Sequence, residues 1–466
     1  MTLELRLNSV RAIALGWMCA LALTACDNGT TTPAADTGPT TTDGGATDAG
    51  ADAAAPAQSI AEIAQADGRF TLLLAAVTRA GLADALSGDG TFTVFAPTDD
   101  AFAASGITRA MIDAMPLDQL TQILQYHALT TEVRSSAITA GPATTLANLS
   151  IILGTTGGVT VNGGNAITGG ANVVLADIDA SNGIIHVIDR VLLPPTIPQL
   201  ATYAGLTSLV TAVGSVDLAT TLSGPGPFTV FAPTNAAFAE LGAGAPTGDA
   251  LRTVLLYHVV SGAVPSTGVP AMAPSLSPNE YGDNMTILFD TTSDVHLNGD
   301  TATVVLADVR ATNGIVHVID HVITPMNVPQ AAEAAGLSSL LTAVGAAAPL
   351  TDGTTVAAAL SAQAPYTVFA PTNDAFAAVA STTATLTPAQ LRDVLLYHVL
   401  SPTAFTTPVL AADLPATATD LATLNGATAR LDPTVTPPTI DGQPIVLTDV
   451  VVSNGVVHVI GGVMLP

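Results

Sequence analysis

Six of the eight histidines fall into three pairs with nearly constant spacing. The members of each pair are 59, 59 and 60 residues apart: His127 and His186, His258 and His317, His398 and His458. Imidazole side chains at a fixed spacing could bind a metal ion or act as general bases. A zinc site usually needs three or four protein ligands, and no third histidine or cysteine accompanies the pairs. The sequence therefore predicts no metal site and no cofactor.

The second histidine of each pair lies in an apolar stretch. In "GIIHVI", His186 alternates with Ile184 and Ile188, while Ile185 and Val187 cover the other face of the expected strand. A strand that is apolar on both faces is buried, so its histidine is expected to be neutral and hydrogen-bonded in the core. The same reasoning applies to the other two strands, and it predicts structural roles for His186, His317 and His458.

The first histidine of each pair directly follows a tyrosine. These Tyr-His pairs stand at the end of a predicted helix: Tyr126 and His127, Tyr257 and His258, Tyr397 and His398. Neighbouring residues at a helix end point in different directions, so one side chain is expected to pack inward and the other to reach the surface. Both a structural role and a binding role stay open for these six candidate binding residues.

The sequence lacks the common motifs for calcium binding, serine hydrolysis and nucleotide binding. "DIDASNG" at 177–183 fails as a calcium loop, because an EF-hand loop needs Gly at its sixth position and Glu at its twelfth, where this chain has Asn182 and Ile188. There is no G-x-S-x-G motif, no P-loop and no dinucleotide-binding fingerprint. The sequence therefore predicts no catalytic residues and a protein that is not an enzyme.

The paired histidines belong to three copies of one longer pattern. "TVFAPT" occurs at 93–98, 229–234 and 367–372, and each copy is followed by a Tyr-His element and then by an Asn-Gly element. Because order and spacing are kept, the chain contains three repeats of one folding unit. "FTVFA" predicts a short buried strand that the proline ends. The threonine after the proline is expected to cap a helix, at Thr98, Thr234 and Thr372.

Each repeat is expected to place helices before strands. Apolar residues at three- and four-residue intervals predict helices near the start of each repeat. In the first repeat, Ser59 and Glu62 indicate a capping box. Apolar runs on both sides of an Asn-Gly turn predict strands near the end. The sequence therefore predicts an α+β fold in which helices pack on a β core.

At these residues the sequence resembles the fasciclin domain family. The family's first box is similar to "TVFAPTDDAF", its Tyr-His element to the three Tyr-His pairs, and its second box to "NGIIHVID". The resemblance covers about residues 58–466. It implies three tandem domains, at 58–194, 195–325 and 326–466, each a wedge-like β-sandwich packed by helices. It also implies an extracellular role in adhesion.

The resemblance further implies a binding site. In animal members of the family, the Tyr-His element and an Asp-Ile pair before the second box are implicated in binding cell-surface receptors. Only the first repeat keeps this pair, as Asp177 and Ile178, whereas the others have 308–309 and 449–450 as Asp-Val. Asp177 and Ile178 are therefore candidate binding residues by resemblance.

The charge balance limits the partners of this chain. It has 11 basic residues, all of them arginine, against 37 acidic residues, which gives a net charge of −26. Nucleic acids and anionic lipid surfaces attract clustered cations, which this composition does not supply. The sequence therefore predicts no nucleic-acid partner.

The first residues have the layout of an export signal. Two arginines precede the apolar run at 12–23, which is too short to span a bilayer. The run ends in Leu-Thr-Ala-Cys26, which resembles the lipobox of bacterial lipoproteins. We expect a lipoprotein signal peptide at 1–25, lipidation at Cys26, and a disordered tether rich in Thr, Ala, Gly and Asp at 26–57. The protein is then exported and lipid-anchored to the bacterial cell envelope, facing the periplasm or the cell exterior.

Repetition favours binding over catalysis, because weak sites gain avidity when they are linked. The leading hypothesis is a surface protein whose three domains mediate multivalent adhesion. Its ligand would be a cell-surface, polysaccharide or protein partner, or another copy of the chain itself. One alternative is a structural envelope spacer without a dedicated ligand. A remote alternative is a hydrolase or metal enzyme with one active repeat.

Overall fold

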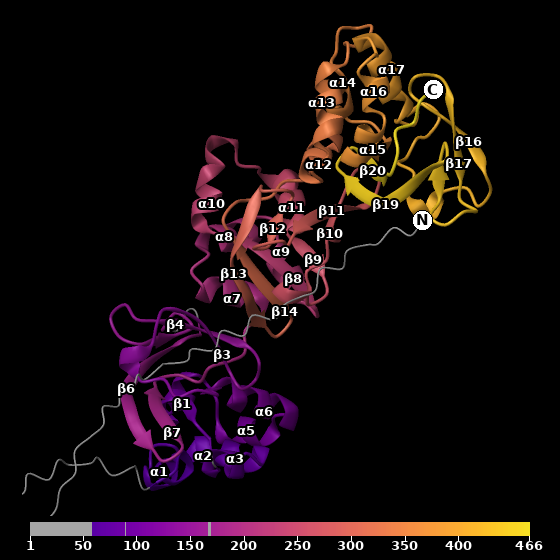
Figure 1. The fold of residues 1–466 in the computed structure, drawn as a ribbon. Coiled ribbons are helices and arrows are strands. Elements are labelled where there is room, and N and C mark those ends of the chain that lie inside the picture. The colour runs from indigo at the N-terminus through magenta and orange to yellow at the C-terminus, as the bar shows by residue number, and fades with distance from the viewer. Residues whose placement is uncertain (1–57, 89, 166–168) are drawn as a thin grey trace, which may run out of the picture. The chain divides into compact units, whose positions relative to one another are not determined.

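The structure is a computed structural model that describes residues 58–466, apart from 89 and 166–168. The expected signal peptide, the lipidation at Cys26 and the tether lie outside the described residues. Within the described ranges, no helix is both long and apolar enough to cross a membrane. The same order of helices and strands occurs three times, and in each repeat helices and a β-sheet pack on one another (Figure 1). The predicted α+β fold with three tandem domains is confirmed.

In the first repeat, two groups of three helices flank strand β1, and most of the other strands follow them in the chain. Its helices are α1 (Ile60–Ala66), α2 (Thr71–Ala80), α3 (Ala83–Ser87), α4 (Asp99–Ala104), α5 (Arg109–Ala114), α6 (Leu117–Tyr126) and the 3-10 turn η1 (Ser135–Ala137). Its strands are β1 (Phe92–Pro97), β2 (Ala128–Leu129), β3 (Gly141–Thr144), β4 (Ser150–Gly154), β5 (Thr160–Val161), β6 (Ala171–Ala180) and β7 (Gly183–Ile188). The spatial order of the strands is β2-β1-β7-β6-β5-β4-β3.

The second and third repeats copy this plan. The second has α7 (Ile197–Tyr203), α8 (Thr207–Ser215), α9 (Leu218–Ser223), α10 (Asn235–Glu240), α11 (Gly248–Tyr257), and β8 (Phe228–Pro233), β9 (Val259–Ser261), β10 (Met272–Pro278), β11 (Asn284–Asp290), β12 (His296–Leu297), β13 (Ala302–Ala311) and β14 (Gly314–Ile319). The third has α12 (Val328–Ala334), α13 (Ser338–Ala346), α14 (Val356–Ser361), α15 (Asn373–Ala378), α16 (Ala380–Thr383), α17 (Pro388–Tyr397), and β15 (Tyr366–Pro371), β16 (Thr419–Ala422), β17 (Thr428–Asp432), β18 (Thr439–Ile440), β19 (Gln443–Val452) and β20 (Gly455–Ile460).

One parallel strand pair lies at the centre of each repeat. The strand that contains the repeated "TVFAP" pairs in parallel with the last strand of its repeat: β1 with β7, β8 with β14, and β15 with β20. The sheet then folds over so that its ends meet at one residue pair, Leu129 with Thr145, Val260 with Ser275, and Leu400 with Thr423. Segments from the beginning, middle and end of each repeat are therefore held in one sheet.

The alternation of side chains along the central strands creates two cores in each repeat. In β1, Val94 and Ala96 pack against the helices, whereas Phe95 points to the opposite side, between the two halves of the folded sheet. In β7, Val187 joins the helix-side core and Ile188 joins the sheet-side core. Because strand neighbours point to opposite faces, a strand buried on both faces is mainly apolar. The one polar side chain of β7, His186, is buried and hydrogen-bonded.

Helix starts are set by the predicted caps. Ser59 and Glu62 form the predicted capping box of α1, and Thr387 with Gln390 forms another at the start of α17. The threonine after each "FAP" accepts a hydrogen bond from the backbone N–H three residues later, at 3.2, 3.1 and 3.1 Å: Thr98, Thr234 and Thr372. Each of these bonds satisfies a helix N–H that has no partner inside the helix.

Candidate functional site

The histidine of each Tyr-His pair is buried at the end of α6, α11 or α17. Nδ1 of His127 donates to the Ile123 carbonyl oxygen at 2.7 Å, and Nε2 accepts from the Leu192 backbone N–H at 2.9 Å. A ring that donates from one nitrogen and accepts at the other is neutral. Burial lowers the pKa of His127, His258 and His398 to about 4. The histidine therefore ties its helix end to the segment after the last strand.

The tyrosines of these pairs are also buried. The Tyr126 hydroxyl donates to the Ser150 carbonyl oxygen at 2.9 Å and accepts from Nδ2 of Asn162 at 3.1 Å. The counterparts Tyr257 and Tyr397 are likewise buried and hydrogen-bonded. The expectation that one member of each pair reaches the surface is wrong. Both side chains point into the domain. The imidazole of His127 bonds to the backbone of Ile123 and Leu192, and the phenol of Tyr126 bonds to Ser150 and Asn162.

The partner of each tyrosine is a residue that sequence reasoning missed. Asn162, Asn298 and Asp441 have left-handed backbones with φ of 54°, 51° and 48°. Their side chains accept from a backbone N–H of the neighbouring strand, at 2.9, 3.1 and 2.6 Å, and each also contacts the phenol. The signal was present, because each is followed by glycine in a turn between two strands, and Asn and Asp tolerate the left-handed region.

The strand histidines lie in the sheet-side core. Nδ1 of His186 accepts from the Asp177 backbone N–H at 3.2 Å, and Nε2 donates to the Val133 carbonyl oxygen at 2.9 Å. His317 and His458 make the equivalent pairs of bonds. Burial lowers the pKa of His317 and of His458. Each strand histidine therefore fixes an irregular stretch of the preceding strand to the loop after the Tyr-His helix.

That irregular stretch contains the Asp-Ile pair. Asp177 has φ of 58°, and the pairing of β6 with β7 shifts register between Leu175 and Ile178. The Asp177 carboxylate accepts from the Ser135 backbone N–H at 2.8 Å and from the Ser135 hydroxyl, and these hydrogen bonds lower the pKa of Asp177. Ile178 is half-buried against the helix-side core. The two candidate binding residues from the first repeat are thus partly engaged inside the domain.

A second register shift, between Val173 and Leu175, accompanies two adjacent exposed apolar residues, which we call the Val-Leu patch. Val174 and Leu175 are 61% and 45% exposed in β6, and the pattern recurs at 305–306 in β13 (57% and 37%) and at 446–447 in β19 (55% and 37%). In a regular strand, neighbours point to opposite faces, so two consecutive exposed side chains require a local change in the strand. The three patches are Val174-Leu175, Val305-Leu306 and Val446-Leu447, and sequence reasoning missed them because "VVLAD" reads as a buried strand.

The paired histidines are held by backbone hydrogen bonds, whereas the Val-Leu patch is exposed. Among the residues that the structure describes, no group of three or more His, Cys, Asp or Glu side chains is placed to hold a metal ion. The six paired histidines use both ring nitrogens for backbone hydrogen bonds, so they can act as general bases only if those bonds break. What recurs on the surface of all three repeats is the Val-Leu patch on its bulged strand.

These features define a tandem-repeat protein built from three copies of one α+β domain. The chain belongs to the fasciclin domain family, whose model matches residues 68–194, 204–325 and 336–466.

Relatives with the same domain come from bacteria and animals. Protein sll1483 of Synechocystis sp. is 40% identical over 141 residues, which is 30% of this chain and 75% of that protein. Transforming growth factor-beta-induced protein ig-h3 of Oryctolagus cuniculus is 28% identical over 431 residues, 88% of this chain and 58% of that protein. Periostin of Homo sapiens is 29% identical over 319 residues, 63% of this chain and 35% of that protein. This chain therefore spans little more than half of ig-h3 and about a third of periostin.

Proposed function

We propose that this protein is a lipid-anchored adhesion protein of the bacterial cell surface, which binds through three fasciclin domains at once. Fasciclin domains occur in cell-adhesion proteins, which supports an adhesion-like role. The observation that carries the proposal is the Val-Leu patch, which recurs at the same strand position in all three repeats. One patch gives a weak contact, and three linked patches give avidity far above that of a single one.

The chemistry of the patch favours a protein partner on another cell, in the matrix, or on a second copy of the chain. Branched apolar side chains next to each other exclude water from a matching apolar surface. The residues around them are hydrogen-bonded within the domain, so the strand does not have to become ordered on binding. In this proposal the Tyr-His pairs, Asp177 and Ile178 position the bulged strand, and the Val-Leu patch makes the contact.

Serine substitutions in the patches test this proposal. We expect the change Val174→Ser with Leu175→Ser to lower the capture of beads coated with the full chain by about ten-fold, and the same change in all three repeats to abolish it. The capture targets are cells of the source strain, arrayed matrix proteins and polysaccharides, and beads that carry the chain itself. Bead capture is counted as a function of surface density.

Matched controls are available in the first repeat. Met111 and Leu117 are exposed to a similar extent, at 50% and 54%, and lie outside the patch. Met111→Ser with Leu117→Ser should capture as well as the wild-type chain. Equal capture by the triple-patch variant and the wild-type chain would rule out the patches as the adhesive surface. Absence of capture by the wild-type chain and by every variant would favour an envelope spacer. A catalytic activity that one isolated repeat retains would favour the hydrolase or metal enzyme.

The lipid anchor has its own test. Cys26→Ser removes the thiol that the lipid would modify, so we expect the variant protein to leave the membrane fraction and to appear in the soluble periplasm or the medium. The measurement is immunoblotting of cell fractions, with Cys19→Ser as the matched control because Cys19 lies inside the apolar run. Retention of the Cys26 variant in the membrane fraction would contradict the anchor.

A further inference from the structure

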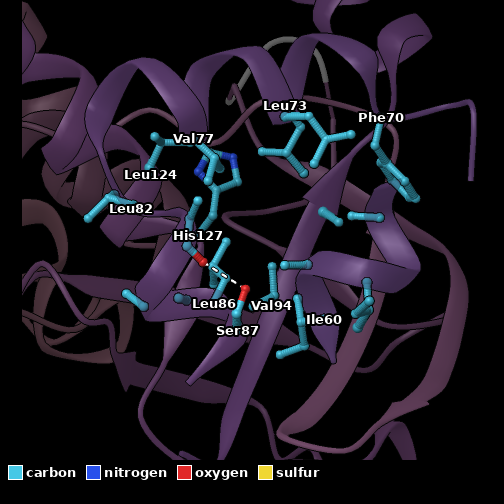
Figure 2. Close-up of a pocket in the computed structure, with 18 of the residues that line it drawn as sticks. Ile60, Phe70, Leu73, Val77, Leu82, Leu86, Ser87, Val94, Leu124 and His127 are labelled. Carbon is cyan, nitrogen blue, oxygen red and sulfur yellow. Dashed lines mark hydrogen bonds between the residues drawn. The ribbon is translucent and has the colours of Figure 1, made fainter. Parts of the chain in front are cut away.

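The helix side of the first repeat contains an apolar cavity that the proposed adhesion does not use. It has a volume of about 320 Å³ and lies among α1, α2, α3, α6 and β1. Figure 2 shows Leu73, Val77, Leu86 and Val94 among the side chains around it, together with His127. An engineered apolar cavity of roughly 150 Å³ stays dry and binds benzene, so this cavity has space for a larger apolar group.

The lining of the cavity carries no charged side chain. Both nitrogens of His127 are occupied by backbone hydrogen bonds, so the ring offers no polar contact to a ligand. The remaining polar lining residues are uncharged and lie toward solvent, at Gln65, Thr78, Ser87 and Gln125. The cavity therefore combines an apolar interior with a neutral polar rim.

The cavity is larger in the first repeat than in the other two, because smaller or less buried side chains line it there. At the same place, the described part of the second repeat has about 190 Å³ and that of the third about 60 Å³. Ala128 lines the large cavity, whereas Val259 and Val399 occupy its position in the other repeats. Helix α3 has no fully buried residue, but α9 and α14 each bury two: Leu218 and Leu222, and Val356 and Leu360.

We propose that this cavity binds one straight acyl chain that carries an uncharged head group, such as that of a monoacylglycerol. The interior lined by Leu, Val, Ile and Ala matches a chain of methylene groups, which gain free energy on leaving water. A free fatty acid fits less well, because the lining has no cation to pair with a carboxylate and the chain has a net charge of −26. The head group then lies at the rim beside Gln65 and Gln125.

Equilibrium dialysis tests this binding on the full chain carrying Cys26→Ser, which has no lipid of its own on that residue. The probes are radiolabelled 1-monolauroylglycerol and laurate, both kept below the concentration at which they form micelles. We expect one monolauroylglycerol per chain and at least ten-fold weaker binding of laurate. Ala128→Val, which copies the second and third repeats, is expected to weaken binding at least ten-fold. Met111→Ser, on the exposed face of α5, should bind like the parent protein.

A gain of binding separates the proposal from a simple loss of structure. Val259→Ala copies the first repeat and enlarges the smaller cavity, so it should add a second bound lipid per chain. Disturbed folding of the Ala128 variant cannot produce that gain. The proposal is overturned by absence of binding to the parent chain, by unchanged binding in the Ala128 variant, or by a Val259 variant that still binds one lipid. The patch variants keep full lipid binding in this proposal, so failure of adhesion and failure of lipid binding are separate results.

Discussion

Gly183→Ala is expected to destabilise the first repeat by roughly 3 kcal/mol or more, while the other two repeats keep their stability. Gly183 has φ of 143°, and an added Cβ would overlap the carbonyl oxygen of Phe92 on the neighbouring parallel strand. Gly314 and Gly455 meet the same obstacle at Phe228 and Tyr366. Relief would require separating the two central strands, on which both cores depend. Amide hydrogen exchange, resolved by repeat, measures the loss and uses the untouched repeats as internal references.

The control for this variant lies in the same repeat. Gly68 has open space around its Cα and does not have a left-handed backbone, so Gly68→Ala should leave stability unchanged or raise it by a few tenths of a kcal/mol. Exchange in the first repeat that is the same for Gly183→Ala and the wild-type chain would show that the parallel pairing is looser than the structure has it.

Acid is expected to destabilise every repeat as the pH falls below 6.5. His127, His258 and His398 have a pKa of about 4 in the folded protein because they are buried, against 6.5 for an ordinary histidine. Between these values the unfolded chain binds more protons than the folded chain, so stability is complete above pH 6.5 and falls as the pH drops toward 4. The loss per repeat is roughly 3 kcal/mol, and larger where the buried His317 and His458 add to it. Urea unfolding between pH 7 and 4 measures it.

His127→Gln tests the origin of this pH dependence. The amide does not titrate, so the first repeat should be less stable at pH 7 but should lose less stability than the other repeats as the pH falls. The second and third repeats serve as controls in the same molecule, each with its own buried histidine. An unchanged pH dependence of the first repeat in this variant would assign the acid sensitivity to other groups.

Local features of the fold could be read from the sequence because they depend on neighbouring residues. The capping boxes at Ser59 and Thr387 and the threonine caps after "FAP" need only residues three positions apart. The burial of the strand histidines also followed from local pattern, since a strand that is apolar on both faces has to be covered on both. The three repeats followed from the recurrence of "TVFAPT", Tyr-His and Asn-Gly elements in one order and at nearly constant spacing.

Hydrogen bonds and strand contacts between segments that are far apart in the sequence could not be predicted in this way. The Asn-Gly turn was recognised as a turn, but Asn182 also accepts from the Ile60 N–H at 2.9 Å and donates to the Leu86 and Gly88 carbonyl oxygens at 2.8 and 3.2 Å. Its glycine is required because β1 lies directly against it. Both facts depend on segments that are about 90 to 120 residues away in the chain.

The sequence by itself determined the number of repeats, the α+β class, the caps and the family. Tertiary structure alone decided which side of each strand faces a core, that both members of the Tyr-His pairs are buried, and that a bulge places Val174 and Leu175 on the surface. It also decided that this cavity is largest in the first repeat, since a valine takes the position of Ala128 in the other two. The physical reason is that burial and exposure are properties of packing between distant segments, whereas helix caps and strand alternation are fixed within a few residues.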